Sequence, residues 1–370
     1  MDLATVTAEG MKMQTALQEV IFGQNKAIDE YVQGYMQYLL NRRSGQKKRP
    51  QVFLFAGPPG TGKSSLAKAV RDYLDMPFMQ FDMTAFADRQ APNTLIGFSQ
   101  TYKDSRSGVL TGFVHSHPEC ILLFDEVEKA HVNVKNLFLQ VLEDGVLRDE
   151  FFDENVDFSR TILIFTTNAG RTLYDTSERQ LSLLPKETVV SALRKERTDT
   201  GDIAIPAALL SRFSAGRIIV FDHMTAAALQ KMITRRCEEY ARQFEKDHGI
   251  EICFDSHLPA SLLYAAPGAD ARALAAGTDS FLNEHVMALI RNLSARQENG
   301  AAGLKQITFI CDDQEEEARK LFMPRPVKTL FFGFKKRHAD MIAGNVDRAA
   351  YLSRSLRCRR ASSSACPSVQ

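Results

Sequence analysis

A glycine-rich run near the beginning of the chain has the residue types and spacing that bind phosphate. Residues 57–64 fit the pattern GxxxxGK[ST] at every position. Glycines let the backbone wrap a phosphate group with its N–H donors, and a helix starting at Lys63 presents its N-terminus to the negative charge. We expect Lys63 to reach the outer phosphates and Ser64 to bind Mg²⁺. The predicted nucleotide-binding residues here are Gly57, Pro58, Pro59, Gly60, Thr61, Gly62, Lys63, Ser64 and Ser65.

A second chemical signal is the acidic pair Asp125-Glu126, which follows the apolar run Ile121–Phe124. An aspartate at the end of a strand supplies a carboxylate that holds Mg²⁺, here expected to act through water. Glu126 can orient and deprotonate an attacking water, so we predict it as the general base. An acidic pair alone could equally be a solvated rim, but the phosphate-binding pattern upstream favours a catalytic role.

Asn168 ends the next apolar run, Thr161–Thr167. Its amide can hydrogen-bond the nucleophilic water or the terminal phosphate, and the alternative is a plain strand-ending asparagine. Together with Lys63 and Glu126, this residue predicts hydrolysis of ATP at the β–γ bond with magnesium.

The elements that must position these residues are apolar strands that alternate with helical stretches. Continuously apolar strands of this kind indicate a parallel sheet that is covered on both faces, with the polar residues at strand ends on one rim. The sequence therefore predicts an α/β fold with a five-stranded parallel sheet. The expected strands are residues 52–56, 78–81, 121–124, 161–167 and 217–221.

The pattern changes after Phe221, where long helical stretches and one strand at Gln306–Ile310 predict a small, mainly α-helical lid domain. Beyond residue 323 the pattern weakens, and we expect a basic, poorly ordered tail. The expected division is an N-terminal helical segment and linker at 1–50, an α/β ATPase domain at 51–222, a helical lid at 223–322 and the tail at 323–370.

The composition limits the class of protein. Of the 370 residues, 44% are hydrophobic and 25% charged, which is ordinary for a globular protein and excludes disorder for the bulk of the chain. No apolar run approaches the roughly 20 residues that span a bilayer, and the first residues do not resemble a secretory signal. Six cysteines without a CxxC pair argue against a zinc site or a disulfide scaffold. We expect a cytoplasmic protein without a membrane partner.

The charge is unevenly distributed along the chain. Residues 324–370 contain ten Lys or Arg and two Asp, whereas the rest of the chain is mildly acidic. A globally basic nucleic-acid binder is therefore not indicated. The basic tail could attract nucleic acid or acidic lipid, but such a run is more often a solvated extension.

These motifs together resemble the AAA+ ATPases, and specifically the Clp family of ring unfoldases and disaggregases, with the greatest likeness to the second ATPase module of two-module members. The run from Leu123 to His131 nearly repeats the family sequence LLDEIEKAH. Further likeness lies in Val20–Ala27, Phe81–Thr84, Leu95–Gly97, Leu139–Gly145 and Val156–Phe158.

The resemblance implies roles that spacing alone does not assign. Ile21 and Phe22 would lie beside the adenine of ATP. Arg212, in the segment 206–212, would be an arginine finger that reaches the nucleotide of a neighbouring subunit. Arg272 would contact the nucleotide from the lid, although Asp270 stands where the family has glycine. Family members form hexamers that unfold or remodel polypeptides, and we expect both properties here.

Two departures from the family concern the substrate and the partner. Tyr102 is the aromatic residue expected to grip substrate in the central pore, but both flanking glycines of the family loop are missing. Residues 170–205 contain no loop for docking on a peptidase, so we expect no peptidase partner. Two alternatives to protein unfolding are an ATP-driven nucleic-acid remodeller, suggested only by Lys103 and Arg106, and a non-motor nucleotide switch that assembles partners.

Overall fold

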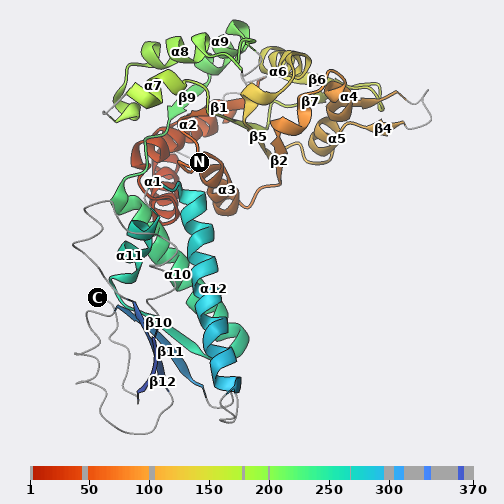
Figure 1. Ribbon diagram of the computed structural model, residues 1–370. Coiled ribbons are helices and arrows are strands. Elements are labelled where there is room, and N and C mark those ends of the chain that lie inside the picture. Colours follow the sequence, from red (N-terminus) through yellow and green to blue (C-terminus); the bar gives the residue numbers. More distant parts are fainter. Residues whose placement is uncertain are drawn as a thin grey trace. The chain divides into compact units, whose positions relative to one another are not determined.

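The computed structural model describes residues 3–43, 49–99, 105–176, 180–198, 201–266, 268–295, 304–311, 329–334 and 357–361 (Figure 1). The chain divides into two compact units, Met1–Met224 and Thr225–Gln370. Each unit has a hydrophobic core of its own. No helix among the described residues is both long and apolar enough to cross a membrane.

A five-stranded sheet forms the centre of the first unit, with the strand order β2-β5-β8-β1-β9. Every neighbouring pair in this sheet is parallel. The predicted α/β fold with five parallel strands is therefore confirmed. The strands are β1 (Gln51–Ala56), β2 (Phe78–Asp82), β5 (Ile121–Asp125), β8 (Ile162–Thr167) and β9 (Arg217–Val220).

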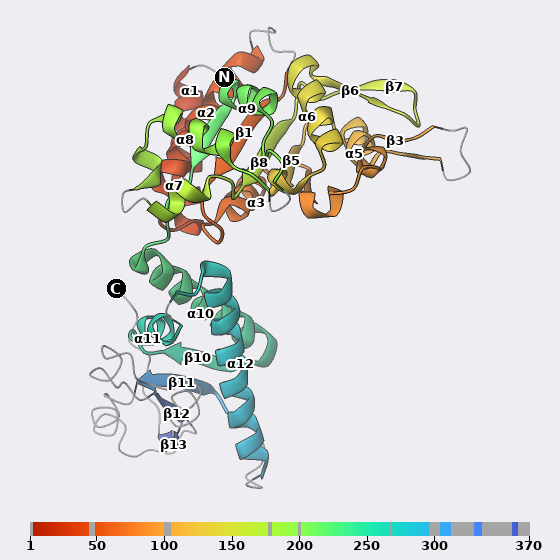
Figure 2. The ribbon, with the colours of Figure 1, turned by 45° about the horizontal axis from the view of Figure 1, so that its top comes forward.

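Helices cover both faces of this sheet (Figure 2). Successive side chains of each strand point to opposite sides, so each face has apolar side chains that the helices bury. Phe53 and Phe55 of β1 pack against α1 (Leu3–Val20), α2 (Asn25–Arg43) and α3 (Lys63–Leu74). Leu54 of β1 packs in a second cluster on the other face, which includes residues of α4 (Ala91–Ile96), α5 (Val109–Ser116) and three further helices. Those three helices are α6 (Val132–Asp144), α8 (Lys186–Lys195) and α9 (Ala207–Ala215).

The other elements of the first unit are short and lie mainly in its connections. Two small hairpins, β3-β4 and β6-β7, are antiparallel. Their strands are β3 (Gly97–Phe98), β4 (Arg106–Ser107), β6 (Val146–Asp149) and β7 (Glu154–Asp157). The short helices are η1 (Met83–Phe86), α4 (Ala91–Ile96), α5 (Val109–Ser116), η2 (Val127–Lys129), α7 (Arg171–Thr176) and η3 (Leu181–Leu183).

In its described residues, the second unit combines three helices with a four-stranded sheet of order β10-β11-β12-β13. Its core joins Ile233 and Leu282 of the helices to Ile307 and Phe309 of the sheet. The helices are α10 (Ala226–His248), α11 (Leu258–Ala265) and α12 (Ala271–Ala295). The strands are β10 (Glu251–Phe254), β11 (Gln306–Cys311), β12 (Thr329–Phe334) and β13 (Arg357–Ala361).

This unit contains more strand than the sequence indicates. The predicted strand corresponds to β11, whereas β10 is only four residues long and begins three residues after α10 ends. Two strands, β12 and β13, fall within the segment expected to be a tail. Most of the tail lies outside the described residues.

Candidate nucleotide-binding site

The loop between β1 and α3 has the backbone that its glycines allow. Gly60 and Gly62 have φ values of 73° and 94°, in the left-handed region that glycine adopts without a Cβ penalty. Gly62 is the N-cap of α3, and no side chain makes a capping bond there. The first N–H groups of α3 therefore lack a side-chain cap, and the positive end of the helix dipole is suited to an anion.

Lys63 lies inside this loop with only 7% of its surface exposed. Its Nζ donates hydrogen bonds to the carbonyl oxygens of Gly57 and Pro58, at 2.8 and 2.6 Å. Pro58 is buried as well, whereas Pro59 and Ser65 are exposed. The two carbonyl groups hold the Lys63 ammonium at the loop, where a bound polyphosphate would need a positive counter-charge.

Ser64 and Asp125 meet although 61 positions separate them in the sequence. The Ser64 hydroxyl donates to the two carboxylate oxygens of Asp125 at 2.8 and 2.9 Å. Asp125 ends β5, whereas Ser64 lies on the first turn of α3, after the loop that follows β1, and β8 lies between β1 and β5 in the sheet. Gln80 also donates to Asp125, at 3.1 Å. A hydroxyl and a carboxylate are the hard oxygen donors that Mg²⁺ prefers, so this pair fits the ion.

The candidate general base is held at the same edge of the sheet. Asn168 Nδ2 donates to Glu126 Oε1 at 2.8 Å. Glu126 has φ 58° and ψ 55°, a left-handed conformation that is costly for a residue other than glycine. Strain of this kind persists only where neighbouring contacts hold the residue in place. The structure thus brings Glu126 and Asn168 together.

Thr166 is a site residue that the sequence analysis did not single out. It is 1% exposed and lies on β8, two residues before Asn168. Its hydroxyl accepts a hydrogen bond from the Glu126 N–H at 3.0 Å and donates one to Asp125 Oδ1. One hydroxyl therefore connects both acidic residues. A threonine two positions before the strand-ending asparagine was the available signal.

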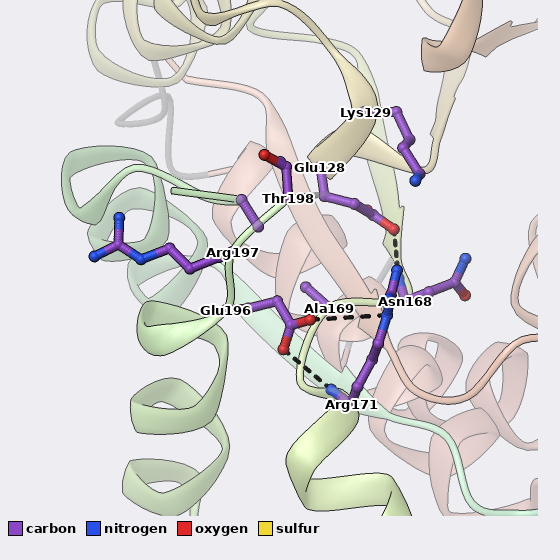
Figure 3. A pocket seen from close by; sticks show the side chains of 9 residues that line it. Glu128, Lys129, Asn168, Ala169, Arg171, Glu196, Arg197 and Thr198 are labelled. Carbon is purple, nitrogen blue, oxygen red and sulfur yellow. Dashed lines mark hydrogen bonds and ion pairs between the residues drawn. The ribbon is translucent and has the colours of Figure 1, made fainter. Parts of the chain in front are cut away.

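A small pocket lies beside Asn168 and is lined mostly by charged side chains (Figure 3). Glu128 is 7% exposed, and its Oε1 accepts from the Asn168 N–H at 2.9 Å. Its Oε2 is buried without a hydrogen-bond partner among the described residues. On the other side, Glu196 accepts from the N–H groups of Gly170 and Arg171. These contacts fix the backbone that carries Asn168. The lining residues are Glu128, Lys129, Asn168, Ala169, Arg171, Glu196, Arg197, Thr198 and Ala204.

The backbone around Glu128 is fixed by a buried amine. Lys135 Nζ donates to the Glu128 carbonyl at 2.9 Å. Burial lowers the pKa of Lys135, while the negative charges of Glu128 and Asp202 oppose that shift.

The two arginines assigned by resemblance lie in different units. Arg212 is near the end of α9 and pairs with Glu143 of α6 in the same chain. Arg272 is exposed on the first turn of α12, in the second unit. Asp270 accepts from the Ala273 N–H at 2.8 Å, so it acts as an N-cap of α12. Its capping role gives a physical reason for an aspartate where the family has glycine.

The remaining predicted residues lie around the turn between α1 and α2 and in the β3-β4 hairpin. Ile21 is buried and Phe22 half-buried in that turn. Gln24, which the sequence analysis did not assign, is 2% exposed and donates to the Thr61 carbonyl in the phosphate loop. Tyr102 lies outside the described residues, between β3 and β4.

Comparison with known proteins agrees with this geometry. Residues 48–215 match a family model described as AAA domain (Cdc48 subfamily). The chloroplastic chaperone ClpC of Pisum sativum is 39% identical over 178 residues, which cover 46% of this chain and 19% of ClpC. A ClpA homolog protein of Fuscovulum blasticum is 37% identical over 159 residues, which cover 43% of this chain and 20% of that protein.

A solved structure extends the likeness beyond these segments. The closed-state cryo-EM reconstruction of Hsp104 with ATPγS and FITC casein matches 78% of this chain and 49% of the Hsp104 chain, with a TM-score of 0.65 and 26% identity. The matched segments span about a fifth of the curated relatives. The fold, the strand-end cluster and these similarities agree that the chain contains an AAA domain, a nucleotide-binding domain that is similar to those of the Clp chaperones.

Proposed function

We propose that this chain binds Mg²⁺ and ATP at the loop of residues 57–64 and hydrolyses the ATP to ADP and phosphate. One observation carries the proposal: the contact of Ser64 with Asp125 joins the phosphate loop to the acidic strand end. Glu126 directly follows Asp125 in the sequence, and its side chain contacts that of Asn168 at the same edge of the sheet. Binding, metal and proton-transfer groups are therefore gathered from three parallel strands.

In this proposal the residues of the first strand end bind the triphosphate. The N–H groups of the loop and the start of α3 bind phosphate oxygens, and Lys63 supplies a positive charge that can move from its carbonyl partners to the outer phosphates. Ser64 and Asp125 hold Mg²⁺. The ion, when bound, neutralises charge on the phosphate oxygens.

The hydrolytic step is assigned to Glu126 and Asn168. The Glu126 carboxylate accepts a proton from the attacking water. The Asn168 amide orients that carboxylate through its 2.8 Å hydrogen bond, and its exposed edge can also donate to the water or the terminal phosphate. Thr166 and Glu128 keep the two residues in place through the Glu126 and Asn168 N–H groups.

We further propose that ATP hydrolysis drives remodelling or unfolding of a polypeptide by a ring of subunits, with a hexamer expected. The support comes from relatives named as Clp chaperones and from the Hsp104 reconstruction, which contains casein. Arg212 would complete the site of a neighbouring subunit, Arg272 would contact nucleotide from the second unit, and Tyr102 would grip the polypeptide. Ile21 and Phe22 would lie at the adenine.

Glu126→Gln tests the proposed reaction. The amide keeps the size of the side chain but cannot accept a proton, so we expect ATP binding within about twofold of wild type and a hydrolysis rate lower by about two or more orders of magnitude. Glu187→Gln, an exposed position on α8, makes the same charge change as a control. Phosphate release and nucleotide binding are measured for both variants. Wild-type turnover in Glu126→Gln would show that Glu126 is not the general base.

The proposed work is tested by the effect of macromolecules on the hydrolysis rate. We expect unfolded casein to stimulate phosphate release by size-defined oligomers, and single-stranded nucleic acid to leave the rate unchanged. Salt-sensitive stimulation by nucleic acid without stimulation by casein would instead identify a nucleic-acid remodeller.

A further inference from the structure

Gln24 connects the phosphate loop to the segment where the chain leaves the first unit. Its Nε2 donates to the carbonyl oxygen of Thr61 at 3.1 Å and to that of Asp222 at 2.9 Å. Its Oε1 accepts from the Asp222 N–H at 3.0 Å. The side chain is 2% exposed, so these bonds are shielded from water. A single carboxamide thus pairs with both backbone groups of Asp222 and with the loop.

The backbone of Gln24 gives this carboxamide a fixed base. The Gln24 carbonyl accepts from the Ile28 N–H at 3.0 Å, which makes it the first acceptor of α2. Ile28 is itself fully buried in the core on that face of the sheet. The carboxamide therefore extends from a packed helix, and its two contacts cannot be separated without moving one of the segments.

On the loop side, the contact fixes the direction of a peptide group. The Thr61–Gly62 peptide is planar and trans, so its C=O and N–H point in opposite directions. Holding the Thr61 carbonyl at Gln24 therefore turns the Gly62 N–H away from Gln24. Thr61 is 3% exposed, and its hydroxyl also donates to the Pro58 carbonyl at 2.8 Å. The loop is thus fixed at Thr61 from two sides.

On the other side, Asp222 is fixed to the sheet and to η3. The Phe221 N–H donates to the Ala56 carbonyl at the end of β1. The Asp222 carboxylate accepts from the N–H and the hydroxyl of Ser182, at 2.8 and 2.7 Å. Two residues, His223 and Met224, remain before the second unit begins at Thr225, the N-cap of α10. The His223 Nε2 lies 3.1 Å from the Tyr174 carbonyl, and Met224 Sδ accepts from Gln24 Nε2 at 3.7 Å. Asp222 is therefore held by Gln24 and by η3, three positions before the second unit begins.

We propose that Gln24 is a positioning residue that couples the conformation of the phosphate loop to the exit segment, residues 221–224. This inference rests on the proposed binding of ATP at the loop. When nucleotide fixes the Gly62 N–H, the Thr61 carbonyl is fixed with it, and the Gln24 carboxamide then holds the backbone of Asp222 more firmly. Loss of the pairing loosens both segments together.

The side chain's chemistry defines the variants that test this coupling. Gln24→Glu lacks the N–H donors and places a carboxylate against the carbonyl oxygens of Thr61 and Asp222. Gln24→Met keeps the length of the side chain and removes both kinds of bond without adding charge. Gln14→Glu is the matched control, because Gln14 also donates to a residue of α2, Asp29 at 2.6 Å, and makes no contact with the loop.

The experiment measures nucleotide affinity and hydrogen exchange of residues 221–224 on the full chain, with and without Mg²⁺ and ATPγS. In the wild type we expect ATPγS to slow exchange in this segment, including the Asp222 N–H that donates to Gln24. In both Gln24 variants we expect affinity to fall by about tenfold or more and the slowing to disappear. Gln14→Glu should retain wild-type affinity and slowing.

The outcomes separate this inference from the proposed function. Wild-type affinity in folded Gln24→Met, or retained slowing at 221–224, overturns the coupling while leaving ATP binding intact. If neither variant folds, hydrogen exchange of the wild-type chain is the test. Exchange at 221–224 that does not change when ATPγS binds overturns the coupling. A wild-type chain that binds no nucleotide overturns the proposed function itself.

Discussion

Thr166 is the residue on which the two acidic side chains of the site depend. Its hydroxyl is both acceptor and donor, to the Glu126 N–H and to the Asp125 carboxylate. Glu126 occupies a left-handed conformation, so the bond to its N–H helps to hold a strained backbone. The candidate metal ligand and the candidate base are therefore oriented by one shared group.

Thr166→Val is expected to impair both acidic residues at once. Valine keeps the shape of the side chain but leaves the Glu126 N–H without its partner, which costs about 1–3 kcal/mol when the group is buried. We expect a lower hydrolysis rate, a higher Mg²⁺ requirement and a modestly lower melting temperature. Thr161→Val, at the beginning of the same strand region, removes a buried hydroxyl that bonds Phe158 instead. Equal Mg²⁺ requirements in the two variants would contradict the role of Thr166.

At this scale the sequence assigns roles to residues whose motif position carries a recognised chemistry. It assigns none to residues that act through tertiary contacts, even where they lie within a motif segment, as Gln24 and Glu128 do. The motif spacing identifies Ser64 and Asp125, and the structure places them within hydrogen-bond distance. Thr166, Glu128 and Gln24 act across strands or between helix and loop, so their partners are set by the tertiary fold. No local pattern encodes such pairings.

At the scale of elements, two glycines of the phosphate loop serve different purposes. A Cβ at Gly57 would lie 2.8 Å from the Cβ and the carbonyl oxygen of Phe221, so the position needs glycine for close packing. A Cβ at Gly62 would meet nothing within 4 Å, but the residue has φ 94°. Gly62 is therefore needed for its backbone conformation at the start of α3.

Alanine at these two positions should separate folding from binding. Gly57→Ala forces the exit segment away from β1, and we expect the larger fall in melting temperature. Gly62→Ala adds backbone strain of about 1–3 kcal/mol at the helix start, and we expect it to lower nucleotide affinity more than stability. Thermal unfolding and nucleotide titration of both variants make the comparison. The assignment would be wrong if Gly62→Ala lowered the melting temperature more than Gly57→Ala did and Gly57→Ala had the larger effect on nucleotide affinity.

The elements themselves were predictable where their sequence is continuously apolar. Strands β1, β5 and β8 are buried along nearly their whole length, and their almost continuously apolar sequences predict this burial. The hairpin strands are two to four residues long and owe their position to distant contacts. Asp149, for example, is completely buried and accepts from the N–H groups of Gly108 and Phe151, which joins both hairpins. Such strands have no periodicity of their own.

At the scale of the whole molecule, Arg212 tests whether sites are completed between subunits. Within one chain it forms an ion pair with Glu143 of α6. The side chain is 37% exposed, so this pair contributes little to stability, and its loss should leave the fold intact. Its proposed partner, the nucleotide of a neighbouring subunit, exists only in an oligomer.

Arg212→Ala is expected to retain nucleotide affinity and to lose hydrolysis in oligomers. Mixing it with Lys63→Ala subunits should restore part of the activity, because some interfaces then combine an intact loop with an intact arginine. Arg160→Ala, which removes another surface ion pair, should leave hydrolysis unchanged. Phosphate release across mixing ratios provides the measurement. No recovery at any ratio in verified mixed oligomers would argue against completion between subunits.

The packing of α1 and α2 on the sheet determines where the protein can be shortened. Tyr31 packs against Phe53 with tilted rings whose centroids are 4.6 Å apart, and both side chains are completely buried. A fragment cut to the family-matched residues 48–215 would expose this aromatic surface to water and invite aggregation. The same cut would also discard Gln24 and Asp222. Expression of the first unit alone therefore requires a fragment that begins before α1 and extends to about residue 224.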